Sequence, residues 1–398
     1  LAWQEEDGRE GHLAGSQGID EFARRRDPAG LAKAHRVRAG ARARLGRIGD
    51  CEADLFEALI AARQADDNRQ ITAALGAAPS AALWGPSPVP KAGGRCLDVV
   101  RMQRMTTAAA SLEATSLRCL AVLELLRGRP DKARSMLADA RQVVADLGLR
   151  HGLMETELFM GIIELMIGDP VAAEPHFRAA SEGLDALGVG ADAGQAAAML
   201  ARSLLAQGRV DEADRYATES ERVAGHNLQT ALAWRAVRAE ILAAHGEHDR
   251  SIDMAREAVA VAAGTDLVLD HAEACLALAR VLAAAGDVAG AAAARRDAAA
   301  LYAAKDVAFS LEANGIRVPA TPHSPAGGSS TSRLTVANRA SEVVEAGYRA
   351  MSAHDADPVI AVFSDGYVLD DRRSLSGDPI QRISELRTAT QRHHGQYP

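Results

Sequence analysis

The chain has 398 residues, which is more than one hydrophobic core usually serves, so we expect either several domains or an array of repeats. Its formal net charge of −8 argues against nucleic acid or an anionic membrane as the main partner. Aromatic residues make up only 4% of a chain that is 48% hydrophobic, so Ala, Leu and Val must build the interior.

The N-terminal residues 1–27 are predicted to form an irregular segment before the main pattern begins. The chain opens with Leu1, which indicates either a non-standard start or a piece of a longer polypeptide. The acidic opening residues are unlike a signal peptide, and no run of about 18 uncharged apolar residues follows. The four cysteines form no CxxC pair. We therefore expect a cytoplasmic protein with reduced thiols.

Five short turn signals then recur at a nearly fixed interval. Their glycines are Gly128, Gly168, Gly208, Gly246 and Gly286, spaced 40, 40, 38 and 40 residues apart. A period of this size is typical of stacked helix pairs. We predict an all-α, tetratricopeptide-like solenoid of about seven helix pairs over residues 28–315. Such an array offers an extended binding surface, which favours recognition over catalysis.

Each repeat is predicted to contain two amphipathic helices that cannot bury their apolar stripes alone. Between Ala133 and Leu147, for example, apolar residues recur at three- and four-residue steps. A second glycine closes each repeat, and we expect it to be left-handed. These closing positions are Gly148, Gly188, Gly225 and Gly264.

Three places depart from the regular repeat. An earlier turn is expected in 45–50, where Gly49 lies 79 residues before Gly128. The proline-rich segment 85–90 is interpreted as a repeat junction with an inserted loop. Pro175 falls inside a predicted helix and should kink that helix or delay its start, because proline lacks a backbone donor.

The periodic pattern ends at Gly315. Residues 316–334 are rich in Pro, Gly, Ser and Thr, which predicts a flexible linker. A second domain is expected over residues 335–398.

The segments 83–89, 204–213 and 228–239 carry a resemblance that covers most of the array. They resemble the tetratricopeptide-like C-terminal regions of bacterial regulators that join an adenylate/guanylate cyclase homology domain, or a DNA-binding domain, to an ATPase of the maltose-regulator type. The resemblance implies a protein partner or a neighbouring ATPase or cyclase domain, with a small effector as a further possibility. The resemblance does not indicate which output domain the region serves.

Residues 340–351, 354–357 and 363–373 resemble the opening of a nuclear-transport-factor-2-like, or SnoaL-like, α+β domain. Fewer residues remain than such a domain requires, so we expect it to be incomplete. The resemblance implies a pocket in which Tyr348, Asp370 and Asp371 could act as acid or base. Many members of that family have no catalytic activity.

Motifs for nucleotide and metal chemistry are absent from the sequence. There is no GxxxxGK[ST] phosphate loop, and no strand-forming segment in 1–315 carries the paired aspartates of a cyclase. An ATPase module, if there is one, must precede Leu1. His245 and His248 flank a turn without a third ligand, which favours a solvated turn over a metal site. We therefore expect no enzyme activity, cofactor or metal.

One residue group is a candidate partner- or effector-binding site within the array. Arg235 and Arg238 share a helical face with Trp234 close by, an arrangement that can grip a carboxylate or phosphate. The alternative, which the pattern favours, is that the arginines brace adjacent helices through Glu240 or Glu257.

Three functions follow from these observations. The first is a non-enzymatic protein-interaction and signal-relay region of a bacterial ATP-dependent signalling or transcriptional regulator. The second is the sensor part of a transcription activator whose DNA-binding domain lies outside this chain. The third is a small-molecule isomerase, dehydratase or ligand binder that uses the C-terminal segment.

Overall fold

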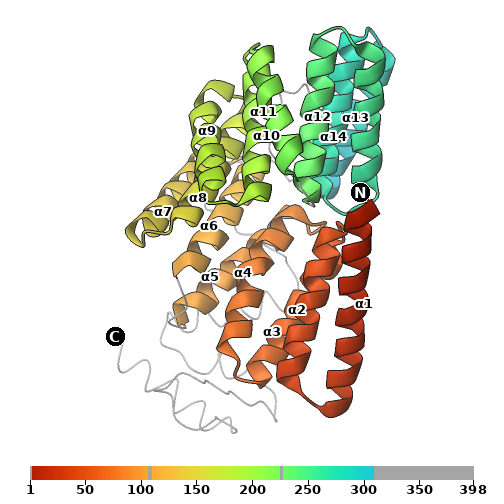
Figure 1. Cartoon of the computed structure of the whole chain (residues 1–398). Helices are drawn as coiled ribbons and strands as arrows, with labels where there is room; N and C mark the ends of the chain where they lie inside the picture. Colours follow the sequence, from red (N-terminus) through yellow and green to blue (C-terminus); the bar gives the residue numbers. More distant parts are fainter. Residues whose placement is uncertain (1, 106–109, 225–226, 309–398) are drawn as a thin grey trace, which may run out of the picture. The chain divides into compact units, whose positions relative to one another are not determined.

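A computed structural model describes residues 2–105, 110–224 and 227–308, and these ranges are entirely helical apart from turns (Figure 1). They contain fifteen α-helices: α1 (Ala2–Arg25), α2 (Pro28–Arg44), α3 (Ile48–Gln64), α4 (Asn68–Trp84), α5 (Val89–Met105), α6 (Ala110–Leu126), α7 (Pro130–Asp146), α8 (Arg150–Ile167), α9 (Pro170–Ala186), α10 (Gly190–Ala206), α11 (Val210–Val223), α12 (Leu228–Ala244), α13 (His248–Ala263), α14 (Val268–Ala284) and α15 (Val288–Ala304).

Helices α2 to α15 form seven consecutive pairs, which confirms the predicted all-α, tetratricopeptide-like array. Figure 1 shows neighbouring helices running back along one another, joined by short turns. The predicted linker 316–334 and the partial α+β domain at 335–398 lie outside the described residues. Among the described helices, none is both long and apolar enough to cross a membrane.

The prediction of an irregular segment at 1–27 was wrong, because α1 occupies Ala2–Arg25 and packs along α2. Its glycines reduce helix propensity, yet they face the neighbouring helix and let it approach closely. A methyl group added at Gly15 would lie 2.7 Å from the Cβ of Arg38, and one at Gly18 would lie 3.1 Å from the Cβ of Ala34. The glycines are thus a packing surface, which composition alone does not distinguish from a loop.

The periodic glycines adopt the conformation that the sequence predicts. Gly128, Gly168, Gly208, Gly246 and Gly286 all have positive φ, between 76° and 96°. This left-handed conformation costs glycine little, because glycine has no Cβ. Among the closing glycines, Gly148 and Gly188 are also left-handed. Gly264 is not, since its φ is −77°, and Gly225 lies outside the described residues.

The three irregular places are only partly as predicted. The first turn falls at Gly46, with φ +70°, whereas Gly49 lies within α3. Segment 85–90 is a helix junction, but only residues 85–88 separate α4 from α5, so no long loop is inserted. Pro175 lies inside α9, which begins at Pro170 and is therefore not delayed.

The even-numbered helices form a closed series of contacts. From α2 to α14, each contacts the next even-numbered helix, and α14 returns to contact α4. A simple solenoid makes contacts only between neighbouring repeats. Here the last helices of the array, α13–α15, also pack against α2–α6. We call this contact the seam.

Backbone hydrogen bonds cross the seam at three places. The amide of Asp266, before α14, donates to the carbonyl of Gly46, before α3, at 3.0 Å. The amide of Val89 donates to the carbonyl of Lys305 at 2.8 Å, and the amide of Ala308 donates to the carbonyl of Leu126 at 2.9 Å. The last two bonds connect the C-terminal end of the array to the start of α5 and the end of α6. The seam therefore fixes both the path of the chain and the position of α14.

Two charged side chains at the seam bind opposite helix ends. The Asp266 carboxylate accepts hydrogen bonds from the amides of Ile48 and Gly49, the latter at 2.8 Å. The buried Lys305 ammonium donates to the carbonyl oxygens of Ala82, at 3.3 Å, and Gly85. A carboxylate at the start of α3 and an ammonium at the end of α4 both complement the helix dipole.

Candidate functional site

The even-numbered helices surround a cavity of about 110 Å³, which we call the inner cavity. Helices α4, α6, α8, α10, α12 and α14 contribute to its wall, together with Tyr302 from α15. Its wall is mainly apolar, with Trp84, Leu165, Met199 and Leu232 among its side chains. The charged residues in the wall are Arg202, Glu240, Asp270, Glu273 and Arg280.

Both carboxylate oxygens of Glu273 in the inner cavity have partners. One carboxylate oxygen accepts a hydrogen bond from the Tyr302 hydroxyl at 2.7 Å, and the other pairs with Arg202. Burial alone would raise the pKa of Glu273, but the charges of Arg202 and Arg280 and these hydrogen bonds hold it below its usual range. Glu273 is therefore an ionised acceptor whose two oxygens are already engaged.

The negative charge of Glu240 is compensated by Arg280. The guanidinium donates two hydrogen bonds to the two carboxylate oxygens, at 2.8 and 2.7 Å. Burial opposes the charge of Arg280, yet the carboxylate of Glu240 raises the pKa of the arginine. This paired geometry fixes both planar groups and leaves Glu240 without a free oxygen.

Asp270 differs from the two glutamates because its partner is neutral. Its Oδ2 accepts a hydrogen bond from the amide of Gln229 at 3.2 Å, and no ion pair with an arginine or lysine is present among the described residues. Burial raises the pKa of Asp270 to about 7, and the negative charge of Glu273 adds to this effect. The ionised form of Asp270 thus lacks a compensating positive charge.

One acceptor in the wall has no hydrogen-bond partner in the described part of the chain. It is the buried Oε1 atom of Gln195. Gln195 lies on α10 and Asp270 on α14, and both line the inner cavity. A buried acceptor without a donor costs free energy, on the order of 1–3 kcal/mol, so such a group calls for an explanation.

A larger cavity of about 640 Å³, which we call the outer groove, adjoins the first. Its wall comes from α2, α3 and α4 and from residues at the starts of α10, α12 and α14. Trp84 lines both cavities, and Gln229 lines the groove while bonding Asp270 in the inner cavity. Small residues such as Ala39, Gly40 and Ala77 leave room in the groove. Helices from both sides of the seam therefore share one site.

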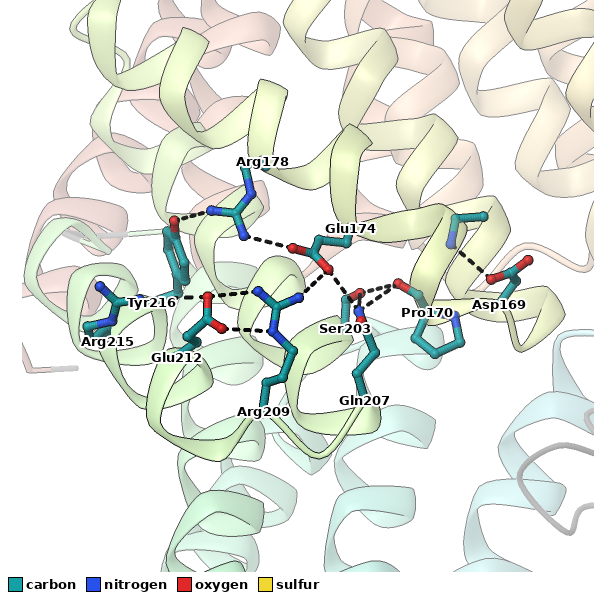
Figure 2. A network of polar contacts seen from close by, with 11 residues as sticks. Asp169, Pro170, Glu174, Arg178, Ser203, Gln207, Arg209, Glu212, Arg215 and Tyr216 are labelled. Atoms are coloured by element: carbon teal, nitrogen blue, oxygen red, sulfur yellow. Dashed lines mark hydrogen bonds and ion pairs between the residues drawn. The ribbon is translucent and has the colours of Figure 1, made fainter.

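A polar network joining α9, α10 and α11 lacks these unsatisfied groups (Figure 2). Glu174 accepts hydrogen bonds from Arg178 at 2.8 Å and from Arg209 at 2.6 Å, and Arg178 donates to the Tyr216 hydroxyl at 2.6 Å. Arg209 also makes two hydrogen bonds to Glu212, both at 2.8 Å. These groups satisfy one another, so the network holds neighbouring repeats together.

The predicted group Trp234, Arg235 and Arg238 lies on α12, outside the wall of both cavities. The Arg235 guanidinium stacks on the Trp234 ring, 4.4 Å from its centre, and pairs with Glu257 at 3.3 Å. Trp234 itself is only 9% exposed.

Arg238 pairs with Asp214 and donates to the Thr218 hydroxyl at 2.8 Å, so it joins α12 to α11. Glu240, the other bracing partner that the sequence suggested, pairs with Arg280 instead. The arginines thus brace neighbouring helices, and a binding role for the Trp234 group stays a prediction. The other predicted pocket residues, Tyr348, Asp370 and Asp371, lie outside the described residues.

The local sequence pattern is only a weak signal for the residues in and around the inner cavity. Gln195, Gln229, Asp270 and Glu273 all lie on the first helix of a pair, amid Ala and Leu. A polar residue in such a helix can equally face solvent or a neighbouring helix. Gln195, Asp270 and Glu273 line the inner cavity and Gln229 lines the outer groove because their helices are brought together with α4, and the contact of α14 with α4 is not encoded in the local pattern.

Comparison with known proteins identifies the fold. No protein-family model matches the chain, and no curated protein matches its sequence. Among solved structures, a Rap protein in complex with competence and sporulation factor is similar, with a TM-score of 0.59, 13% identity, and coverage of 68% of this chain and 75% of the other. Aspartyl phosphate phosphatase F from Bacillus subtilis has a TM-score of 0.53 and 11% identity, with 71% and 73% coverage.

RapI in its apo form has a TM-score of 0.51 and 9% identity, with coverage of 69% of this chain and 98% of the other. At these identities the likeness shows the fold alone. The chain is a tetratricopeptide-like helical-repeat protein, similar in structure to Rap proteins.

Proposed function

We propose that this array is a non-enzymatic recognition and relay region that binds a segment of a protein partner, or a small effector, in the outer groove and inner cavity. The observation that carries the proposal is the composition of the groove wall. Residues from α2–α4 and from the starts of α10, α12 and α14 meet there, so one ligand contacts both sides of the seam.

Contact with both sides of the seam gives a physical route for relay. A ligand that binds the closed seam more tightly than a looser arrangement of the same helices shifts the population toward the closed state. The size of this shift is limited by the difference between the ligand's affinities for the two states. Any module attached to either end of the array would respond to that shift. Here that module is proposed to be the ATPase, cyclase or DNA-binding part of a bacterial regulator.

The proposal assigns no catalysis to the described residues. Glu240 and Glu273 pair with arginines, so their carboxylate oxygens are already engaged as hydrogen-bond acceptors. The Rap protein of similar fold is complexed with competence and sporulation factor, which supports recognition as a use of this architecture. The proposal assigns recognition by the inner helices to this chain as well.

The test fills the outer groove without disturbing the core. Ala77 is exposed in the groove, so Ala77→Trp should occupy the space at little cost in stability. The matched control is Ala179→Trp, which adds the same side chain at an exposed position of α9. Peptides are first selected from a random heptapeptide library on the full chain, and their affinities are then measured by fluorescence anisotropy.

We expect Ala77→Trp to weaken the selected peptides at least tenfold and Ala179→Trp to leave them unchanged. Equal affinities for the two variants would exclude the groove as the recognition site. Steady turnover of ATP by the full chain would overturn the non-enzymatic assignment.

A further inference from the structure

We infer that the inner cavity receives a cationic nitrogen group with several N–H donors, a primary ammonium or a guanidinium, carried on a short apolar chain. The Asp270 carboxylate and the Gln195 amide oxygen would accept its hydrogen bonds. This inference rests on the proposed function, because it specifies the chemistry that the same site recognises.

The first step is whether the open polar groups of the wall are hydrogen-bond donors or acceptors. Two acceptors of the wall are open to a cation: the Oε1 atom of Gln195 has no partner among the described residues, and the carboxylate of Asp270 has a neutral partner but no cationic one there. An acceptor is satisfied only by a donor, and a charged donor forms the stronger hydrogen bond with a carboxylate. An ammonium offers three donors and a guanidinium offers five, enough to reach both acceptors.

The second step is the balance of charge in the wall. Two arginines, Arg202 and Arg280, face three acids, Glu240, Asp270 and Glu273. Each arginine already pairs with a glutamate, so neither is left to bind an anion. A single positive charge would neutralise the remaining carboxylate, Asp270. An anion would instead add to an existing excess of negative charge in a partly desolvated site, which is costly.

The third step is size and the rest of the wall. A water molecule requires about 10–15 Å³ of such space, so a cavity of about 110 Å³ holds a group of several heavy atoms. Leu165, Met199 and Leu232 supply apolar contacts for the chain that carries the cation. A lysine or arginine side chain and a free alkylamine share this chemistry, and the two sources are distinguished below.

The experiment measures binding of small probes to the full chain by isothermal titration calorimetry at pH 8. The cationic probes are n-butylammonium and n-butylguanidinium, and the matched probes of similar size are n-butanol and butyrate. We expect at least one cationic probe to bind at least tenfold more tightly than n-butanol, and butyrate to bind least. Equal binding of n-butanol and both cations would overturn the charge assignment.

A pair of variants ties the result to Asp270. Asp270→Asn keeps the shape of the side chain but removes its charge, and we expect it to weaken the cationic probes at least tenfold while n-butanol is unchanged. The control, Asp139→Asn, removes a carboxylate from an exposed position on α7 and should change nothing. Unchanged cation binding by Asp270→Asn would overturn the inference.

A further arm separates the two sources of the cation. An acetylated, amidated Ala-Ala-Arg-Ala peptide that binds at least tenfold more tightly than n-butylguanidinium indicates a peptide ligand, and the reverse order indicates a free small molecule. Either order supports the cationic site. If the probes show no preference for cations but Ala77→Trp still weakens the selected peptides, the proposed function stands and only this inference is rejected.

Discussion

The middle of the array and the seam are held together by different kinds of contact. In α7–α11, the turns are made by left-handed glycines and the polar contacts join neighbouring repeats, as in the Glu174 network. At the seam, Asp266 binds amides that lie 217 and 218 positions away, and Lys305 binds carbonyl oxygens 220 and 223 positions away. Local periodicity therefore specifies the helix pairs, while long-range apolar packing and charged residues at helix ends specify how the array closes.

The largest effect is expected from reversing the charge of Lys305. Its side chain is fully buried, at 0% exposure, against the carbonyl end of α4. Lys305→Glu places an unpaired negative charge there, so we expect a loss of about 3–5 kcal/mol in the free energy of unfolding. Urea denaturation measures the loss, and hydrogen exchange should rise in both α4 and α15.

Two further lysine variants define what Lys305 contributes. Lys33→Glu makes the same charge change at an exposed position of α2 and should alter stability by less than about 0.5 kcal/mol. Lys305→Met keeps most of the buried volume but loses the donors, so its effect should lie between the two. Equal stability of Lys305→Glu and Lys33→Glu would mean that the seam does not depend on this charge.

A variant in the middle of the array should behave differently. Leu184 on α9 is fully buried in an apolar cluster of α8 to α12, and Leu184→Ala is expected to cost about 2–5 kcal/mol through lost burial and the remaining cavity. Hydrogen exchange should rise mainly in α8, α9 and α10, the helices nearest to it in the array. Leu147→Ala, at a position that is 51% exposed, is the matched control and should be nearly neutral. Loosening of α4 and α15 by Leu184→Ala would contradict the contrast between the two regions.

The inner cavity predicts a pH dependence with a definite sign. Burial raises the pKa of Asp270 from the ordinary 3.8 to about 7, so between these values the folded state holds a proton that the unfolded state has released. The folded state is therefore stabilised below pH 4 and loses this contribution as the pH rises toward 7, by about 1.4 kcal/mol or less for each pH unit. Because the side chain faces a cavity, we expect a total on the order of 2 kcal/mol.

Asp270→Asn removes this titration, so it should be more stable than the wild type at pH 7.5 and similar at pH 4. The groups around Asp270 remain: Glu273 and Arg280 on α14, Arg202 on α10, Glu240 and Gln229 on α12, and Tyr302 on α15. The difference between the variant and the wild type, measured by thermal unfolding across this range, isolates Asp270. A difference that does not change with pH would show that Asp270 is already ionised at pH 4.

The division between local and long-range contacts also explains what the sequence could predict. The 40-residue glycine interval was sufficient for the five pairs from α6 to α15, because a left-handed turn is a local property of glycine, and the two earlier pairs were predicted by extending the interval upstream. The interval carries no information about α14 meeting α4, so the inner cavity and the roles of Asp270 and Gln195 could not be derived. The helix α1 was missed for a related reason: its glycines are explained only by the close approach of α2.

The smallest of the expected effects compares a long-range helix cap with a local one. Asp169 caps its own helix, α9, by accepting a hydrogen bond from the amide of Ala172 at 2.9 Å. Helix α3 begins after Arg47, whose side chain makes no capping bond in the described structure, and Asp266 provides that acceptor from the turn before α14. We expect Asp169→Ala to cost about 1 kcal/mol and Asp266→Ala about 1–2 kcal/mol.

The location of the effect is more informative than its size. Asp169→Ala should raise hydrogen exchange only in the first turn of α9, whereas Asp266→Ala should raise it at the amides of Ile48 and Gly49 and also in the first turn of α14. Asp266→Asn keeps an acceptor oxygen and should retain most of the protection of Ile48 and Gly49. If Asp266→Ala leaves these two amides protected, α3 does not need the distant cap, and the polar contacts that hold the seam are Lys305 and the backbone hydrogen bonds of Val89, Asp266 and Ala308.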